Sequence, residues 1–453
     1  MLAPGVRRLR PDDHFMIVAE TDASPMHVGA LLFLDVPPAE RPGLRERIAR
    51  QIAERLPATP LLCRLVASPD GYDSDAWAEL AGCDLDYHVT SARLDDGGEA
   101  TIRAFLPTCS MERLDLARPP FRLFVLEGLA DGRSALYLKM HHSIADGIGF
   151  QTILALLGDA QPPVPPRLRD AVVPDEAEWR SLAEARFTEL ADAAQAHRRG
   201  RREAKAGLEA LNARGEPDRP ATPVLALSGP TSPKRSYATL SLSLADIKAL
   251  GEALGATVNH IFLALAGTAL RNYLIEVGDL SATPIVANSA RSYRRPEHGA
   301  FGNRIVALHP HLATHLADPI DRLRAIQAEM ARELRRTAFD EALLDAPEEP
   351  FGPRERRARL TGRLAGSARL LPGNVTLSNV PGPAEALSYA GYRVTGNFPV
   401  PILGSGRFLN VTSRRNADRL DMGIMTDAEK IPDATRIARA MAAAVEEYRH
   451  VAR

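Results

Sequence analysis

The sequence has little cysteine and almost no net charge. Its 453 residues contain only Cys63, Cys83 and Cys109, too few and too widely spaced for a disulfide framework or a zinc module. Lys and Arg together number 56 against 57 Asp and Glu, a formal charge of −1, so the overall charge gives no reason to expect a nucleic-acid partner. Free thiols are typical of a reducing compartment, so we expect a cytoplasmic protein. The balanced charge leads us to expect that it binds no nucleic acid.

Long apolar runs are also lacking. The first residues, Met1 to Arg8, have no apolar core of the kind found in signal peptides, and no stretch reaches the length needed to cross a membrane. We therefore expect a chain that is soluble or attached only peripherally to a membrane.

The remaining composition is that of a globular protein, with 45% hydrophobic and 25% charged residues. The chain is longer than one core usually supports, so two domains are expected. Proline-rich segments at 161–166 and 216–233 interrupt it, since proline cannot continue a helix. We predict an N-terminal domain over residues 1–165, a helical connector with a proline-rich linker over 166–234, and a C-terminal domain over 235–453.

A basic cluster lies in the expected connector, whose helical stretch runs from about residue 175 to 213. The cluster consists of Arg198, Arg199, Arg201 and Arg202. Such a run usually forms a solvated helix face, but it can also contact an anionic membrane or a nucleotide phosphate. The sequence leaves both interpretations open.

Apolar periodicity predicts a mixture of strands and helices, which indicates an α/β fold. The expected strands are 26–34, 84–89, 122–126, 236–242, 374–380, 407–412 and 419–425. The other expected helices are 43–55, 243–255, one that begins after Thr257, one that begins at Pro319 and one over 433–448. Ser243 and Thr257 are suitable N-cap residues for two of these helices.

One stretch looks built for chemistry: Ala135-Leu136-Tyr137-Leu138-Lys139-Met140-His141-His142-Ser143-Ile144-Ala145-Asp146-Gly147. As a strand it alternates, so His141 and His142 point to opposite faces. Adjacent strand residues cannot both reach one ion without a bend, and no further ligand pattern is present, so we expect no metal site. Asp146 can cap the following helix, and Gly147 can let the backbone turn.

His142 has two interpretations on these grounds alone. It is a general base that takes a proton from an attacking hydroxyl group, or a structural histidine with its hydrogen bonds satisfied. Ser143 is a weak candidate nucleophile because its surroundings are not Gly-x-Ser-x-Gly. His27, at the start of an expected buried strand, either makes a backbone hydrogen bond or lines a pocket.

Several short motifs, in this order and spacing, make the chain resemble the bacterial wax ester synthase/diacylglycerol acyltransferase family. That family lies within the superfamily that includes chloramphenicol acetyltransferase and condensation domains. The resemblance runs nearly end to end. The motifs are Ser24-Pro25-Met26-His27-Val28-Gly29, Asp84-Leu85-Asp86-Tyr87-His88-Val89, the His141 to Gly147 segment, Gly302-Asn303-Arg304, Ser378-Asn379-Val380-Pro381-Gly382-Pro383, Leu409-Asn410-Val411-Thr412 and Leu420-Asp421-Met422-Gly423.

The resemblance implies a fold and a reaction. It implies two chloramphenicol acetyltransferase-like α/β sandwich domains joined by the connector, with the active site in a tunnel at their interface. It implies transfer of a fatty acyl group from acyl-CoA, a co-substrate, to diacylglycerol or a long-chain alcohol, with no further cofactor. The enzyme would work in the cytoplasm, peripherally on the inner face of the membrane or on lipid droplets, and the resemblance leaves room for a homodimer.

The resemblance also implies residue roles. His142 would be the general base, with His141, Asp146 and Gly147 as its scaffold. Ser378 or Asn379 would stabilise the oxyanion, although such residues equally often close a junction between strand and turn. The remaining candidates are Asn259 for substrate positioning and His27 and Phe121 for the pocket.

The chain departs from the family at two places. Pro119-Pro120-Phe121 stands where the family usually shows Pro-Leu-Trp, and Asn259-His260 stands where it usually shows Asn-Asp. The first change keeps an aromatic residue, whereas the second removes a carboxylate from a helix N-terminus. The altered residues leave room for a relative that acylates a specialised metabolite or uses a carrier-bound acyl group. A non-catalytic lipid-binding protein is a further alternative.

Overall fold

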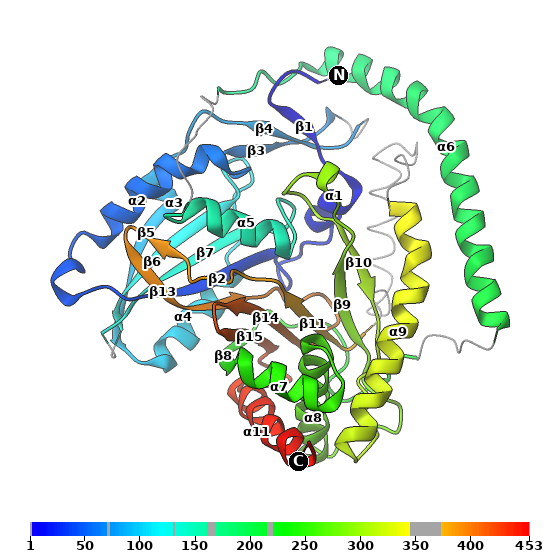
Figure 1. Ribbon diagram of the computed structural model, residues 1–453. Helices are drawn as coiled ribbons and strands as arrows, with labels where there is room; N and C mark the ends of the chain where they lie inside the picture. Colours follow the sequence, from blue (N-terminus) through cyan, green and yellow to red (C-terminus); the bar gives the residue numbers. More distant parts are fainter. Residues whose placement is uncertain are drawn as a thin grey trace.

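The computed structural model describes residues 2–69, 73–129, 132–160, 169–214, 221–344 and 373–452. These residues form two six-stranded sheets and one three-stranded sheet, with helices packed around them (Figure 1). The proline-rich segment 161–166 lies outside the described residues, as does the start of the 216–233 segment.

The first sheet carries the two histidines. Its strands, in spatial order, are β12 (Ser388–Tyr389), β13 (Tyr392–Val400), β2 (His27–Leu34), β7 (Ser134–His141), β6 (Phe121–Leu129) and β5 (Val89–Gly97). The predicted alternation in β7 is confirmed, because Leu136, Leu138 and Met140 face one hydrophobic cluster and Tyr137 faces another. Helices α2 (Leu44–Arg55) and α5 (Gly147–Leu157) pack on the first of these faces, and α4 (Glu99–Met111) packs on the second.

The second sheet has one apolar and one polar face. Its strands, in spatial order, are β10 (Ile305–Leu308), β9 (Ala287–Ser292), β11 (Val375–Val380), β14 (Leu409–Asn416), β15 (Arg419–Asp427) and β8 (Arg235–Ser243). The helices of this half are α7 (Leu244–Leu254), α8 (Val258–Glu276), α9 (Pro319–Leu344) and α11 (Thr435–Val451). One face of this sheet is buried against α8, α9 and α11 through Val375, Leu377, Leu409 and Val411. The alternate residues of β11 and β14 must therefore face the other way.

A segment from the C-terminal half completes the first sheet. Strand β13 pairs antiparallel with β2, with Val400 opposite Gly29 and Val394 opposite Leu34. The chain therefore leaves the second sheet after β11, adds β12 and β13 to the first sheet, and returns as β14. The predicted division, with residues 235–453 as a separate C-terminal domain, does not follow the sheets here.

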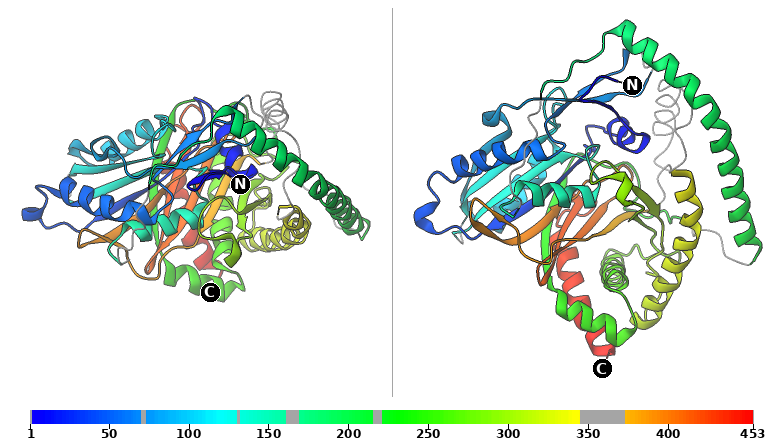
Figure 2. Two further views of the ribbon diagram at one scale, coloured as in Figure 1. Left: turned by 90° about the horizontal axis from the view of Figure 1, so that it is seen from above. Right: turned by 45° about the horizontal axis from the view of Figure 1, so that its top comes forward.

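The connector helix is confirmed. Helix α6 (Glu176–Ala213) begins after Asp175, whose side chain accepts a hydrogen bond from the Glu178 amide. In both views of Figure 2 it runs along the outside of the molecule, and it packs against α9. The small sheet, β1 (Val6–Arg8), β4 (Ala76–Glu79) and β3 (Cys63–Val66), lies near its start in Figure 1. Helix α1 (Pro11–Val18) follows β1 in the chain.

One predicted strand is wrong. Residues 84–89 begin with a helical turn, α3 (Leu85–His88), because the Asp84 carboxylate accepts hydrogen bonds from the Asp86 and Tyr87 amides. The strand there starts only at Val89. The predicted caps are confirmed, since Ser243 caps α7 and Thr257 caps α8.

Among the described helices, none taken singly has the length and apolar composition of a membrane span; α7 and α8, which meet at a sharp bend of 94°, pass that test only as a pair.

Candidate active site

His142 follows directly after strand β7, in the loop that leads to α5. Its amide donates to the Met26 carbonyl at 2.8 Å, and its own carbonyl accepts a hydrogen bond from Asn303 Nδ2 at 2.8 Å. Asn303 also donates, through N and Nδ2, to Asp13 Oδ1 of helix α1. The backbone of His142 is thus held from both halves of the chain.

The imidazole ring of His142 has two different environments. The Nδ1 atom is buried and makes no hydrogen bond of ordinary geometry to a described residue, whereas the side chain as a whole is partly exposed to a cavity. Burial lowers the pKa of His142 below its ordinary value, against the opposing influence of its own carbonyl group and of Asp146. The ring is therefore neutral near pH 7, with Nε2 as the nitrogen open to the cavity.

Asp146 shapes the loop. Its Oδ1 accepts from the Gly149 amide and so caps α5, as predicted, and its Oδ2 accepts from Arg294 Nη2 at 2.8 Å and from the Arg304 amide at 3.0 Å. Gly147 comes next, and a Cβ atom there would lie 2.9 Å from Val380 Cγ2 of β11. Both residues therefore set how closely the loop approaches the second sheet.

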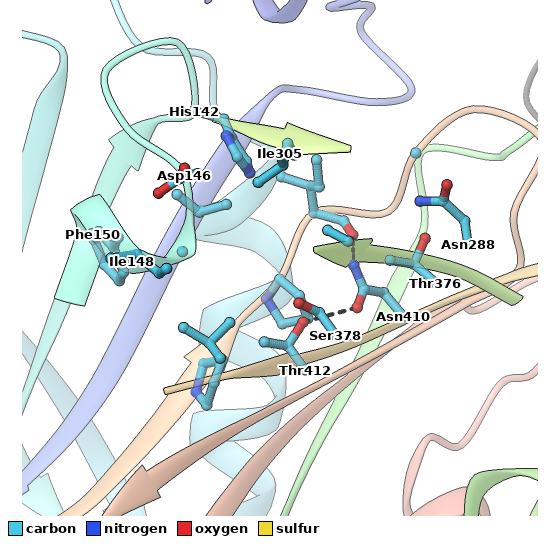
Figure 3. Close-up of a pocket in the computed structure, with 18 of the residues that line it drawn as sticks. His142, Asp146, Ile148, Phe150, Asn288, Ile305, Thr376, Ser378, Asn410 and Thr412 are labelled. Atoms are coloured by element: carbon cyan, nitrogen blue, oxygen red, sulfur yellow. Dashed lines mark hydrogen bonds between the residues drawn. The ribbon is translucent and has the colours of Figure 1, made fainter. Parts of the chain in front are cut away.

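A cavity of about 340 Å³ lies between the two sheets, with His142 in its wall. Figure 3 shows His142, Asp146, Ile148 and Phe150 on one side and the residues of β11 and β14 on the other. The apolar part of the lining includes Phe15, Met16, Met26, Val28, Ile148, Phe150, Val400 and Ile402.

The opposite wall is the polar face of the second sheet. Because β11 and β14 pair in parallel, Thr376 lies opposite Asn410 and Ser378 opposite Thr412. All four line the cavity, together with Asn288 of β9. Asn410 Nδ2 donates to the Ile402 carbonyl at 2.6 Å, so its Oδ1 accepts from the Thr412 hydroxyl at 3.0 Å. The wall therefore presents oriented hydroxyl and amide groups to His142.

Comparison with known proteins gives this geometry a context. Residues 9–262 match the family described as the wax ester synthase/diacylglycerol acyltransferase catalytic domain, and residues 301–449 match the WS/DGAT C-terminal domain. The chain belongs to the wax ester synthase/diacylglycerol acyltransferase family. It is accordingly an acyltransferase.

A curated relative and two solved structures agree with this membership. "Probable diacyglycerol O-acyltransferase tgs2" of Mycobacterium tuberculosis is 31% identical over 454 residues, covering 95% of this chain and 96% of the relative. The wax ester synthase/diacylglycerol acyltransferase from Marinobacter aquaeolei VT8 has a similar structure, with TM-score 0.69, 24% identity and coverage of 98% and 99%. The first condensation domain of the calcium-dependent antibiotic synthetase follows, with TM-score 0.61, 15% identity and coverage of 97% and 96%. These likenesses confirm the predicted two-domain α/β fold.

In this acyltransferase, His141 and His27 lie outside the cavity lining of the described residues. They face each other across β7 and β2, and the ring of His141 lies 5.8 Å from that of His27. His27 Nε2 is 3.3 Å from Glu20 Oε1, and burial lowers the pKa of His141 to about 3. His141 Nδ1 does lie 2.6 Å from Ser143 Oγ, but both groups are buried away from the cavity, so the serine is no nucleophile there.

The two residues predicted to stabilise the oxyanion are placed differently relative to the cavity. Ser378 lines the cavity and faces the same way as Thr412, whereas the side-chain oxygen of Asn379 accepts from Ser413 Oγ at 2.9 Å. Asn379 also borders the cavity, but as the next residue of β11 its side chain points toward the other face of the sheet. Ser378 is thus the better placed of the two.

Phe121 and Asn259 are not brought to the cavity. Phe121 is fully buried and stacks on His88, with ring centroids 4.6 Å apart. Asn259 lies in the first turn of α8, where His260 Nδ1 accepts from the Thr257 amide and Thr257 Oγ1 accepts from the His260 amide. The histidine thus completes a capping box at the position where the family usually has Asp.

The described residues contain no group of three or more His, Cys, Asp and Glu side chains placed to hold a metal ion. The sequence interpretation missed the roles of Asn303, Arg294 and the β14 pair Asn410 and Thr412. The Gly302-Asn303-Arg304 and Leu409-Asn410-Val411-Thr412 motifs were the available signal, since each places polar residues within an apolar surrounding.

Proposed function

We propose that this acyltransferase moves a fatty acyl group from acyl-CoA to the hydroxyl group of diacylglycerol, of a long-chain alcohol, or of both. The names of the relatives from Mycobacterium tuberculosis and Marinobacter support these acceptors. The cavity suits such substrates, because apolar side chains on one side can surround a hydrocarbon chain and polar groups face the reacting ester. Acyl-CoA is a co-substrate, so no separate cofactor is required.

One observation carries the proposed mechanism: the neutral His142 ring, with Nδ1 buried and Nε2 open to the cavity. Nε2 takes the proton of the acceptor hydroxyl as its oxygen attacks the thioester carbonyl carbon. The tetrahedral intermediate then collapses, the carbon–sulfur bond breaks, and the imidazolium returns the proton to the leaving thiolate. The products are an ester and free CoA, and no acyl-enzyme forms.

We further propose that the Ser378 hydroxyl donates a hydrogen bond to the oxyanion of this intermediate. Its side chain lies on the cavity face of β11 beside Thr412, whose own hydrogen is engaged by Asn410. Ser378 Oγ makes no hydrogen bond to a described residue, so its hydrogen is available to a ligand. A donor held in place in this way stabilises the negative charge as it forms on the carbonyl oxygen.

The decisive experiment uses purified protein with labelled palmitoyl-CoA and diacylglycerol, hexadecanol or no acceptor, followed by separation of the lipids. We expect ester formation with at least one acceptor, and a rate about 100-fold lower for His142→Gln, because general base catalysis contributes roughly that much. His298→Gln, in an exposed turn outside the cavity, is the matched control. A folded His142→Gln variant as active as the parent would refute the mechanism.

The same assay separates the other candidate functions. An enzyme specific for a specialised metabolite would leave all three mixtures unreacted but release CoA from palmitoyl-CoA once that acceptor is supplied. An enzyme that uses a carrier-bound acyl group would also leave them unreacted, and would release the free carrier thiol instead of CoA once the acyl carrier is supplied. A lipid-binding protein without turnover would bind palmitoyl-CoA and release no CoA in any mixture. Because the proposed substrates partition into membranes and lipid droplets, we also propose that the enzyme works peripherally on such a surface.

A further inference from the structure

A buried arginine lines the same cavity, and acyl transfer as proposed gives it no role. Arg414 lies on β14 two residues after Thr412, so its side chain is on the cavity face of the strand. The residue is only 2% exposed and borders the cavity together with Phe150 and Val380. A cation is therefore built into the cavity wall beside hydroxyl, amide and hydrocarbon groups.

Arg414 makes no ion pair with any residue that the structure describes. Its Nη1 donates to Asn397 Oδ1 at 3.0 Å, its Cζ lies 5.2 Å from the centroid of the Phe150 ring, and its Nε is buried without a hydrogen bond. Asp421 lies directly opposite Arg414 on β15, but its oxygens accept from the Asn397 amide, from Asn416 Nδ2 and from Ser241 Oγ rather than from the guanidinium. Burial lowers the pKa of Arg414 to about 10, so the guanidinium keeps its charge at neutral pH.

Neither Asp421 nor the acid that borders the cavity contacts the Arg414 guanidinium. Asp146 also borders the cavity, but its oxygens accept from Arg294, the Arg304 amide and the Gly149 amide. Among the described residues that line the cavity, Asp146 is the only acid, and Arg407 is a second arginine. Burial of a charge without a contacting partner is costly, so an anion that enters the cavity would be stabilised at Arg414.

We propose that Arg414 binds a carboxylate carried by one of the two substrates, which rests on the proposed O-acyl transfer in this cavity. A guanidinium presents paired N–H groups that match the two oxygens of a carboxylate. The carboxylate belongs either to the acceptor, as in a hydroxy fatty acid, or to the acyl group, as in an acyl-CoA with a terminal carboxylate. In both cases the cavity prefers that substrate over its neutral counterpart.

Binding tests the inference without turnover. Isothermal titration compares omega-hydroxydecanoate with decanediol, two probes of equal chain length that differ in the carboxylate. We expect the parent protein to bind the hydroxy acid about tenfold more tightly, as expected for hydrogen bonds to a charged group. Arg414→Met should abolish the preference and Arg414→Lys should keep part of it. Arg415→Met, on the opposite face of β14 and outside the cavity, should keep all of it.

Two results would overturn the inference: equal binding of both probes by the parent protein, or an unchanged ratio in Arg414→Met. If Arg414 had a purely structural role, Arg414→Met would weaken the binding of both probes equally. The ratio of the two affinities would then stay unchanged, and the inference would be overturned. Turnover with each probe as acceptor, and with decanoyl-CoA or its omega-carboxy analogue as donor, then identifies which substrate carries the carboxylate. Absence of ester in every mixture would refute the proposed function. The role of Arg414 is tested separately, by the ratio of the affinities for the two probes.

Discussion

The two histidines of the central segment have different surroundings because one position along a strand reverses the direction of a side chain. His141 points into a cluster with His27, Glu20 and Ser143. In that cluster, burial works to raise the pKa of Glu20, but hydrogen bonds from His27 and Arg113 lower it to about 2. His142 lies just past the strand end and reaches the cavity. The choice between them as base therefore follows from exposure.

The pH dependence of the reaction should reflect His142. The neutral ring is the form that accepts a proton, and burial lowers its pKa below the ordinary histidine value of about 6.5. The rate should therefore stay constant as the pH falls through 6.5 and decline only at lower pH, where the ring becomes protonated. The measurement is kcat/KM against pH in a protein shown to stay folded over the range. An acid limb at or above the ordinary value would contradict this environment.

Asn303 should act as a positioning residue. Asn303→Ala removes the donor to the His142 carbonyl and one donor to Asp13, leaving buried acceptors unsatisfied. We expect a loss of about 1–3 kcal/mol in the free energy of unfolding and a fall in kcat of about tenfold with little change in KM. Urea unfolding and steady-state kinetics measure the two effects. If kcat per folded molecule stays at the parent level, Asn303 supports only the fold.

At the scale of elements, strand alternation builds the site wall. In β11 and β14 one set of alternate residues enters the core under α8, α9 and α11, and the other set forms the polar face opposite His142. Helix α5 approaches this face through Gly147, which leaves no space for a side chain beside Val380. The distance between base and wall depends on this contact.

Gly147→Ala should therefore destabilise the protein by about 1–3 kcal/mol, the usual cost of overpacking. Val380→Ala should relieve the clash, so the double variant Gly147→Ala/Val380→Ala should be more stable than the sum of the single effects predicts. A double-mutant cycle in urea unfolding measures this coupling. Strict additivity would show that the loop adjusts without contact at Val380.

His260 should prove a capping residue. Its neutral ring accepts from the Thr257 amide at the start of α8, outside the cavity. We expect His260→Asp to keep or raise stability, since a carboxylate near a helix N-terminus contributes about 0.3–1 kcal/mol. Thr257→Ala should lose about 1 kcal/mol. The ratio of rates with diacylglycerol and hexadecanol should not change in His260→Asp, and a shifted ratio would return this position to the substrate site.

At the scale of the whole molecule, the second half holds the catalytic loop of the first. Gly302 bridges to Ala145, Asn303 reaches the His142 carbonyl, and Arg294 pairs with Asp146. In the other direction, β13 crosses over to pair with β2. The two halves are thus interlocked around the cavity, and neither forms the site by itself.

The Asp146–Arg294 ion pair allows the contact between the two halves of the chain to be tested. Arg294→Met leaves a buried carboxylate with one partner fewer, and breaking such a pair typically costs about 3–5 kcal/mol. We expect a lower unfolding midpoint together with lower activity. Exposed Arg439→Met, which removes the Arg439–Asp433 ion pair, is the control and should change little. Loss of activity in Arg294→Met at parental stability would instead place Arg294 at the substrate.

Much of this protein follows from local sequence. The alternation in Ala135 to His142, the caps at Asp146, Ser243 and Thr257, and the connector helix all depend on neighbours a few residues away. The predicted strand at 84–89 failed because a capping aspartate outweighed apolar alternation over so short a stretch.

The rest depends on contacts between residues far apart in the chain. Sequence alone offered Ser378 and Asn379 equally, and only the packing of the two sheets, which places the face with Ser378 and Thr412 opposite His142, separated them. His27 and Phe121 were offered as pocket residues, yet packing buried both. Asn303, 161 residues from His142, and Arg414, which enters the cavity beside Phe150, owe their positions to the pairing of the two sheets. One segment of the sequence was enough to propose His142 as the base, whereas the residues around it come from strands that only folding brings together.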